Sequence, residues 1–154
     1  MKTNYVVALV AGGLLLVGGA SAQEKKINRS DLPPAVEKTV SAQSAGATIR
    51  GFSTEKENGQ TLYEVAMTVN GHSKDISMAA DGSIVEIEEQ VALDSLSPEV
   101  KTGLQAKAGK GKILKVESLT KKDKLVAYEA QVDTNGKKSE VQVGPDGKPL
   151  AHEE

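Results

Sequence analysis

Two segments of the chain alternate apolar and polar residues with the period of a half-buried β-strand. They read YEVAMTVNG at residues 63–71 and YEAQVDTNG at residues 128–136. Each ends in Asn-Gly, a dipeptide that accepts the positive φ angles of a tight hairpin. Alternation places Tyr63 and Tyr128 on an apolar face and the glutamate after each on the polar face. We therefore expect two equivalent strands, each followed by a hairpin.

Before each strand, apolar residues recur at helical spacing. In the second half a helix is expected to begin after Ser97, a good N-cap, and to end at Gly109. Val100 and Leu104 fall on one face of that helix. The first half repeats this arrangement over residues 34–46. One amphipathic helix thus precedes each group of strands.

The two halves match in order along the chain, which indicates an internal duplication. An offset of 64 aligns Pro34 with Pro98, and an offset of 65 then aligns Asp81 with Asp146, each before a glycine. We predict an α+β fold of two tandem repeats, each one helix packed on a three- to four-stranded antiparallel sheet. The repeats are expected at residues 23–90 and 91–154, and whether they share one continuous sheet is left open.

Residues 1–22 are typical of a signal peptide, so they are excluded from the fold. Lys2 precedes an apolar stretch at residues 5–20, and Ala20 and Ala22 suit a cleavage site before Gln23. The alternative is a retained anchor, which four glycines in that stretch disfavour. We expect a periplasmic or secreted protein without a stable membrane anchor after cleavage.

Composition argues against most catalytic chemistry. The chain has no Cys, one Phe, three Tyr and no Trp, which excludes disulfides, thiolate chemistry and Cys-ligated zinc. His72 follows a turn and His152 lies near the C-terminus, and neither has a nucleophile nearby in a recognised motif. We predict a protein that is not an enzyme, with no catalytic residue, no metal ligand and no cofactor.

Charge differs between the halves. Residues 28–90 hold five basic and ten acidic side chains, whereas residues 91–154 hold eleven and ten. Lysines gather at positions 107, 110, 112 and 115 and around Lys122. Nucleic acid is not an expected partner, because the exported chain has a net charge of −3 and few aromatic residues for stacking. A protein, an anionic envelope component or solvent alone remain the alternatives for these lysines.

The leucine-to-proline helix start, the Tyr-Glu strand and the Asn-Gly and Asp-Gly turns resemble the PepSY-like superfamily. Tandem copies behind a signal peptide are similar to its β-lactamase-inhibitor-like branch. The resemblance covers nearly all of the exported chain, and its matching positions are mainly structural. It implies an extracytoplasmic module that binds or restrains proteases or other envelope proteins, and it carries over no catalytic residue.

The polar strand face is the predicted binding site, because it lies opposite the residues that the helices cover. We predict a non-enzymatic binding module whose partner is another envelope protein. The alternative is a periplasmic protein that binds a small ligand or a metal ion on the same face. The predicted site residues are Glu64, Thr68, Glu129, Gln131 and Asp133.

Overall fold

A computed structural model describes residues 24–57, 59–152 and 154 of the chain. The predicted signal peptide and its cleavage site lie outside these residues. Within the described part, no helix is long and apolar enough to cross a membrane. In the part of the chain that the structure describes, two α-helices and eight β-strands follow one another, with a short 3-10 turn before each helix. Their bounds are β1 Lys25–Ile27, α1 Pro34–Gln43, β2 Thr48–Glu57, β3 Gln60–Val69, β4 His72–Met78, β5 Ile84–Val91, α2 Pro98–Ala108, β6 Lys112–Lys121, β7 Lys124–Thr134 and β8 Lys137–Val143.

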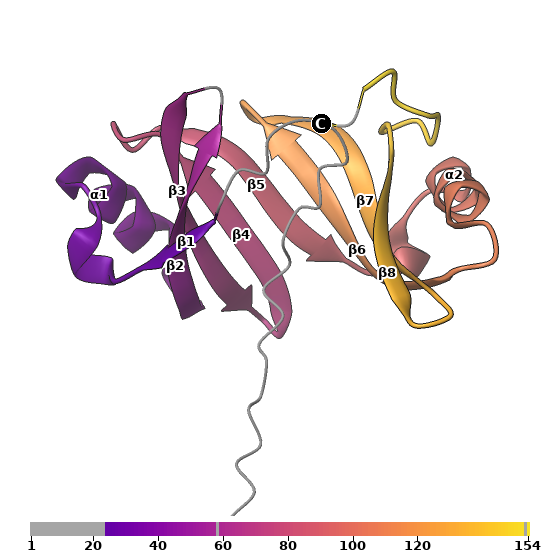
Figure 1. Cartoon of the computed structure of the whole chain (residues 1–154), viewed down its shortest axis with the longest axis horizontal. Helices are drawn as coiled ribbons and strands as arrows, with labels where there is room; N and C mark the ends of the chain where they lie inside the picture. The colour runs from indigo at the N-terminus through magenta and orange to yellow at the C-terminus, as the bar shows by residue number, and fades with distance from the viewer. Residues whose placement is uncertain (1–23, 58, 153) are drawn as a thin grey trace, which may run out of the picture.

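All eight strands form one antiparallel sheet in chain order, β1 to β8 (Figure 1). The prediction of two repeats, each with its own helix on a small sheet, is therefore wrong. The two halves join where β5 pairs with β6, from Glu86 opposite Lys121 to Val91 opposite Val116. An unpaired strand edge exposes a row of backbone hydrogen-bonding groups, so pairing β5 with β6 removes an edge from each half.

Strand β5 packs into both hydrophobic cores. Its Ile87 lies against the first core, around Val65 and Ile76. Its Val91 lies against the second, around Val116 and Val132. Residues 87 and 91 share a face of the strand because side chains alternate with a period of two. Both cores therefore lie on the same face of one sheet.

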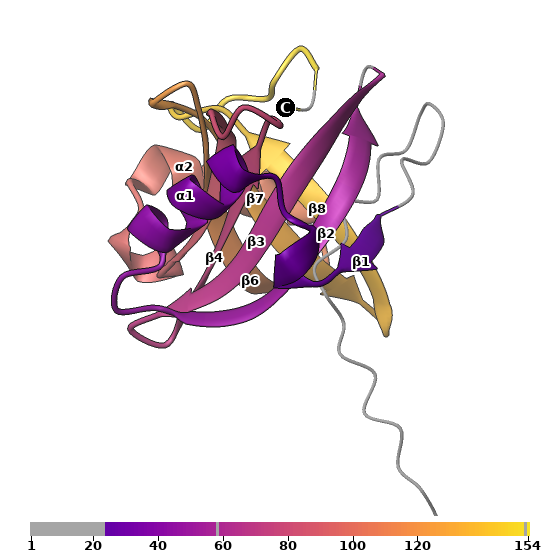
Figure 2. The ribbon, with the colours of Figure 1, turned by 90° about the vertical axis from the view of Figure 1, so that its left-hand side faces the viewer.

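Each core is covered by one helix. Val36 and Val40 of α1 are buried in the first core, and Val100 and Leu104 of α2 are buried in the second. Figure 1 shows the two helices at opposite ends of the molecule, with the middle strands between them. Figure 2 shows them on one side of the strands. No helix of the described residues covers the other face of the sheet.

The local predictions of helices and turns are confirmed. Helix α2 begins after Ser97, whose side chain accepts a hydrogen bond from the Val100 backbone N–H, and its C-cap is Gly109. Asn70 and Asn135 have φ angles of 51° and 56°, as the first residue of a type I′ hairpin requires. Tyr63 and Tyr128 are half-buried against the first and second cores, on the helix-covered face.

Candidate functional site

The helix-free face of the sheet, called the open face below, is rich in carboxylates. Cross-strand pairing fixes one row across it: Glu117 on β6 lies opposite Glu129 on β7, which lies opposite Gln142 on β8. On the same face, in the first half of the sheet, Glu64 on β3 lies opposite Ser53 and Ser77. The acidic side chains of this face include Glu55, Glu64, Asp75, Glu86, Glu88, Glu117, Glu129, Asp133 and Glu140.

The five predicted site residues belong to this face, but they do not form one cluster. Glu64 and Thr68 lie on β3, whereas Glu129, Gln131 and Asp133 lie on β7. Strands β4, β5 and β6 separate the two groups. Asp133 lies at the hairpin, where its carboxylate accepts a hydrogen bond from the Gly136 backbone N–H. The grouping of these residues as a binding site remains a prediction.

Burial changes the chemistry of the two predicted glutamates. Desolvation, followed by the charge of Asp75, raises the pKa of Glu64 from 4.5 to about 7. Desolvation also raises the pKa of Glu129 to about 7, although a hydrogen bond from Gln142 opposes this change. Neither side chain is freely solvated, because Glu129 is buried and Glu64 is only partly exposed.

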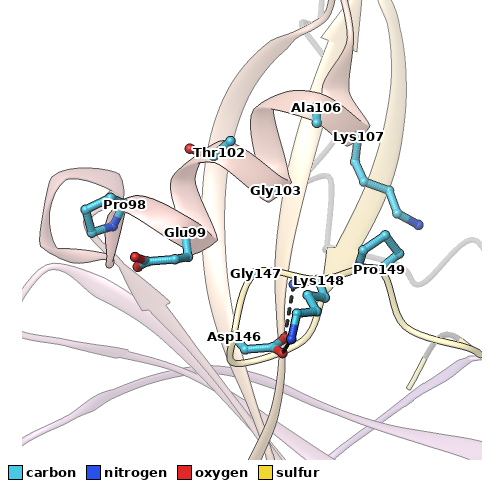
Figure 3. A pocket seen from close by; sticks show the side chains of 10 residues that line it. All are labelled: Pro98, Glu99, Thr102, Gly103, Ala106, Lys107, Asp146, Gly147, Lys148 and Pro149. Carbon is cyan, nitrogen blue, oxygen red and sulfur yellow. Dashed lines mark hydrogen bonds and ion pairs between the residues drawn. The ribbon is translucent and has the colours of Figure 1, made fainter.

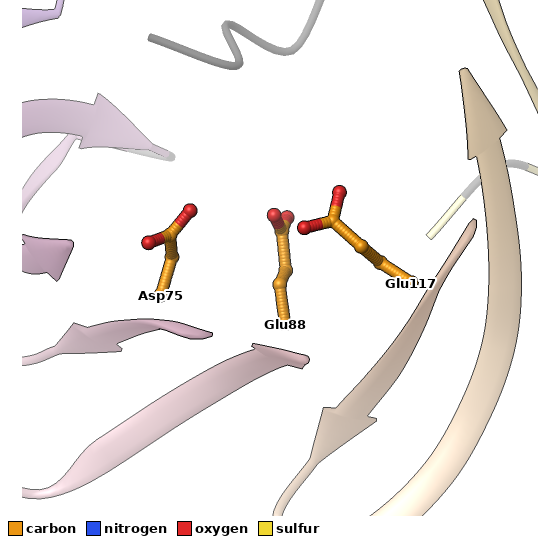
Figure 4. Close-up of side chains that lie close together, drawn as sticks. All are labelled: Asp75, Glu88 and Glu117. Atoms are coloured by element: carbon orange, nitrogen blue, oxygen red, sulfur yellow. The ribbon is translucent and has the colours of Figure 1, made fainter. Parts of the chain in front are cut away.

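Three carboxylates from neighbouring strands meet in the middle of the open face. Asp75 on β4, Glu88 on β5 and Glu117 on β6 each present an oxygen, and these oxygens lie within 4.8 Å of one another. In Figure 4 the three side chains extend from adjacent strands in one direction, and the carboxylates of Glu88 and Glu117 come close. The sequence analysis named no metal ligand, yet oxygen ligands at this spacing are those that hard cations prefer.

Two of these three carboxylates have basic partners on the protein itself. Arg50 Nη2 lies 2.6 Å from Asp75 Oδ1, and Lys115 Nζ lies 2.7 Å from Glu117 Oε1. Glu117 also accepts a hydrogen bond of 3.1 Å from the Ser73 hydroxyl. The protein therefore already balances part of the negative charge of the cluster.

Glu88 differs from its two neighbours. It lies opposite Asp75 on β4 and opposite the buried Leu119 on β6. Among the described residues, Glu88 and Glu64 form no hydrogen bond or ion pair through their carboxylates. Desolvation, followed by the charges of Glu86 and Glu129, raises the pKa of Glu88 well above its ordinary value of 4.5. An ionised carboxylate here is costly unless a cation comes to it.

Sequence reasoning missed Asp75, Glu88 and Glu117 as a group. Alternation along β5 does place Glu86 and Glu88 on one face, so that part of the signal was present in the sequence. The cluster also depends on which strands are neighbours, however. Glu117 meets Glu88 only because β5 pairs with β6, and the sequence analysis had left this pairing open.

A shallow groove lies on the other side of the molecule, between α2 and the turn after β8 (Figure 3). Thr102, Ala106 and Pro149 are among the residues that line it, and a Lys148–Asp146 ion pair of 2.8 Å closes the turn. Hydrogen bonds from Lys148 hold the pKa of Asp146 at the groove below its ordinary value. The open face, with its cluster of partly buried carboxylates, is therefore the better candidate for a binding site than the groove.

Comparisons with known proteins reveal the fold but not a family. No protein-family model and no curated protein matches the chain. A Bacteroides eggerthii protein named as periplasmic matches with a TM-score of 0.62 at 17% identity, over 77% of this chain and 86% of that one. A DUF2874 family protein from Bacteroides ovatus matches with a TM-score of 0.60 at 20% identity, over 77% and 84%. A BLIP-like protein from Bacteroides fragilis matches with a TM-score of 0.56 at 18% identity, over 77% and 83%.

The chain thus has the fold of these Bacteroides proteins. A BLIP-like fold agrees with the β-lactamase-inhibitor-like part of the resemblance seen in the sequence, whereas its PepSY-like part stays a prediction. The name of the B. eggerthii protein places that protein in the periplasm, in agreement with the location predicted here from the sequence.

Proposed function

We propose that this is a periplasmic, non-enzymatic binding module that docks another envelope protein against its open face. The observation that supports this most concerns two carboxylates of this face, Glu64 and Glu88. Neither forms a hydrogen bond or an ion pair with another described residue. They lie on the sheet face opposite the one that α1 and α2 cover. A broad polar surface of this kind suits a protein better than a small molecule, which is usually held in a concave and largely apolar pocket.

The charge of the open face indicates a basic partner segment. Its carboxylates outnumber the basic groups that reach them, which are Arg50, Lys115 and Lys121. A Lys or Arg side chain from a partner would ionise Glu88 and Glu64 and would recover the energy lost by desolvating them. Binding should then release protons and should weaken as salt is added.

The alternative of a metal-ion site rests on the cluster of Asp75, Glu88 and Glu117. Arg50 and Lys115 would have to give up these carboxylates, or share them, for a divalent cation to bind with full charge complementarity. A partner side chain that binds only Glu88 and Glu64 leaves the Arg50–Asp75 and Lys115–Glu117 ion pairs intact. Protein docking is therefore the better-supported function.

Neutralising the open face should weaken partner capture at least tenfold, as the loss of about 1.4 kcal/mol of binding free energy would do. The variant is Glu64→Gln, Glu88→Gln and Glu129→Gln in the exported chain, because glutamine keeps the size of the side chain and removes the charge. A partner recovered from an envelope fraction is titrated against this variant and the parent chain. Charge reversal is unsuitable, since a lysine at position 129 would be buried.

The matched control replaces the same number of carboxyl groups on other surfaces, through Glu89→Gln, Asp94→Asn and Glu99→Gln. It should bind the partner as the parent does. Equal binding by the parent, the open-face variant and the control would place the docking site elsewhere. Saturable binding of calcium alone that Glu88→Gln abolishes, with partner capture unchanged, would replace docking by a cation site.

A further inference from the structure

One end of the sheet bears a group of exposed lysines, called the lysine tip below. Lys112 on β6 and Lys138 on β8 lie opposite the same residue of β7, Asp133. The remaining members are beside them, since Gly111 approaches Thr134 at the end of β7 and Thr134 lies opposite Lys137. The lysine tip consists of Lys110, Lys112, Lys137 and Lys138, all exposed.

These lysines have little internal compensation. None of the four forms an ion pair within the described part of the chain. Asp133, the acidic residue between Lys112 and Lys138, already accepts a hydrogen bond from the Gly136 N–H. With strands about 4.8 Å apart, Lys112 and Lys138 leave β6 and β8 roughly 10 Å from each other. A flat anionic surface could contact both together.

The fold itself does not require these lysines. The first half builds the same helix end and the same Asn-Gly turn, at residues 43–48 and 70–73, with no Lys or Arg at all. Asn70 and Gly71 adopt the same positive φ angles there as Asn135 and Gly136. The turn and the helix end therefore do not explain why lysines are found at the tip.

An exposed leucine lies beside the lysine tip. Leu114 is the large apolar residue with an exposed side chain in the described part of the chain, at 44% exposure. It is the extra residue of a β-bulge, since pairing with β7 passes from Ile113 directly to Lys115. The corresponding bulge in the first half holds Arg50, which turns back to bind Asp75 and the Met67 carbonyl.

We propose that the lysine tip and Leu114 form a membrane-contact surface that binds the anionic phosphate headgroups of a lipid bilayer. Clustered lysines are drawn to a negatively charged membrane, and an apolar side chain among them can enter the headgroup region. Leu114 favours a bilayer over a soluble polyanion, because a polyanion gains nothing from an exposed leucine. Contact of this kind is reversible and needs no spanning helix.

The test is sedimentation of the exported chain with vesicles of phosphatidylcholine, with and without phosphatidylglycerol. We expect binding only to the anionic vesicles and a steep loss as salt is raised. Lys112→Gln with Lys138→Gln should lower the partition coefficient about twentyfold, since each lysine near such a surface contributes roughly fivefold. Leu114→Ser should lower it about fivefold.

The control is Lys122→Gln with Lys124→Gln, in the hairpin between β6 and β7, which lies at the other end of those strands. It should bind anionic vesicles nearly as the parent does. Three results would overturn the proposal: equal binding to neutral vesicles, an equal loss in the control, or a loss with the lysine variant but none with Leu114→Ser. Urea unfolding of each variant verifies that the fold is kept. The carboxylates of the docking test are unchanged in all of them.

Discussion

Gly103→Ala should destabilise the protein by about 3 kcal/mol, although alanine is the better helix former by about 1 kcal/mol. Gly103 lies in α2, where its φ angle is ordinary. A Cβ atom there would collide with the backbone carbonyl oxygen of Gly147, in the turn after β8. The collision is with the backbone, so no side-chain rotation relieves it.

The same contact is made differently in the first half, which explains why glycine is needed only once. The residue of α1 that corresponds to Gly103 is Thr39, and its hydroxyl donates a 2.8 Å hydrogen bond to the Gly82 carbonyl. Each Asp-Gly turn thus lies against one helix. In both halves the turn glycine approaches the helix backbone, at Ala35 for Gly82 and at Glu99 for Gly147, but in the second half the helix residue that faces the turn is itself a glycine.

Urea unfolding of Gly103→Ala measures this effect, with Gly51→Ala as the control. Gly51 lies in β2, and a Cβ atom there would meet nothing within 4 Å. Its replacement should change the free energy of unfolding by about 0.5 kcal/mol or less. Equal stability of the two alanine variants would mean that the turn does not press on α2 as described.

The second large effect is a loss of stability as pH rises from about 5 to 8. Glu64 and Glu129 have their pKa raised from 4.5 to about 7 in the folded protein, so the folded state binds more protons than the unfolded state between these values. The unfolding free energy must then fall as pH rises through this window. Each residue should account for about 2 kcal/mol of the loss.

Replacing both residues, as Glu64→Gln and Glu129→Gln, should therefore flatten the pH dependence and raise stability at pH 8. Glu89→Gln serves as the control, because Glu89 is exposed and lies on the opposite face of β5 from Glu88. The prediction is tested by measuring the midpoint of urea unfolding for each variant across this pH range. A parent protein that gains stability toward pH 8 would show that these carboxylates are solvated.

Local features of this fold could be predicted from the sequence because each depends on a few adjacent residues. Ser97 and Gly109 specify the ends of α2, and Asn135-Gly136 specifies a hairpin. The alternation from Tyr63 onward correctly separates a helix-covered face from an open one. Glu64 and Glu129 were found in this way, on the face where the other carboxylates lie.

The arrangement of the strands could not be predicted in the same way. Pairing of β5 with β6 joins residues about 30 positions apart, such as Glu88 and Leu119, and no turn signal specifies it. Without that pairing, Asp75, Glu88 and Glu117 are separate acidic residues of three strands. The three-residue strand β1 is too short to show any periodicity. Burial of Glu129 likewise depends on its neighbours across the sheet and not on its own segment.

The central claim is that the open face is the docking surface, and site-specific photo-crosslinking in the producing cell tests it most directly. A photoreactive benzoylphenylalanine replaces Gln131 or Ser77 on the open face, or Thr102 or Gln105 on α2. Docking on the open face predicts a crosslinked protein adduct from both open-face positions and none from the α2 positions. Introducing Glu64→Gln together with Glu88→Gln should reduce the yield of the open-face adducts. Adducts from the α2 positions alone would contradict this prediction.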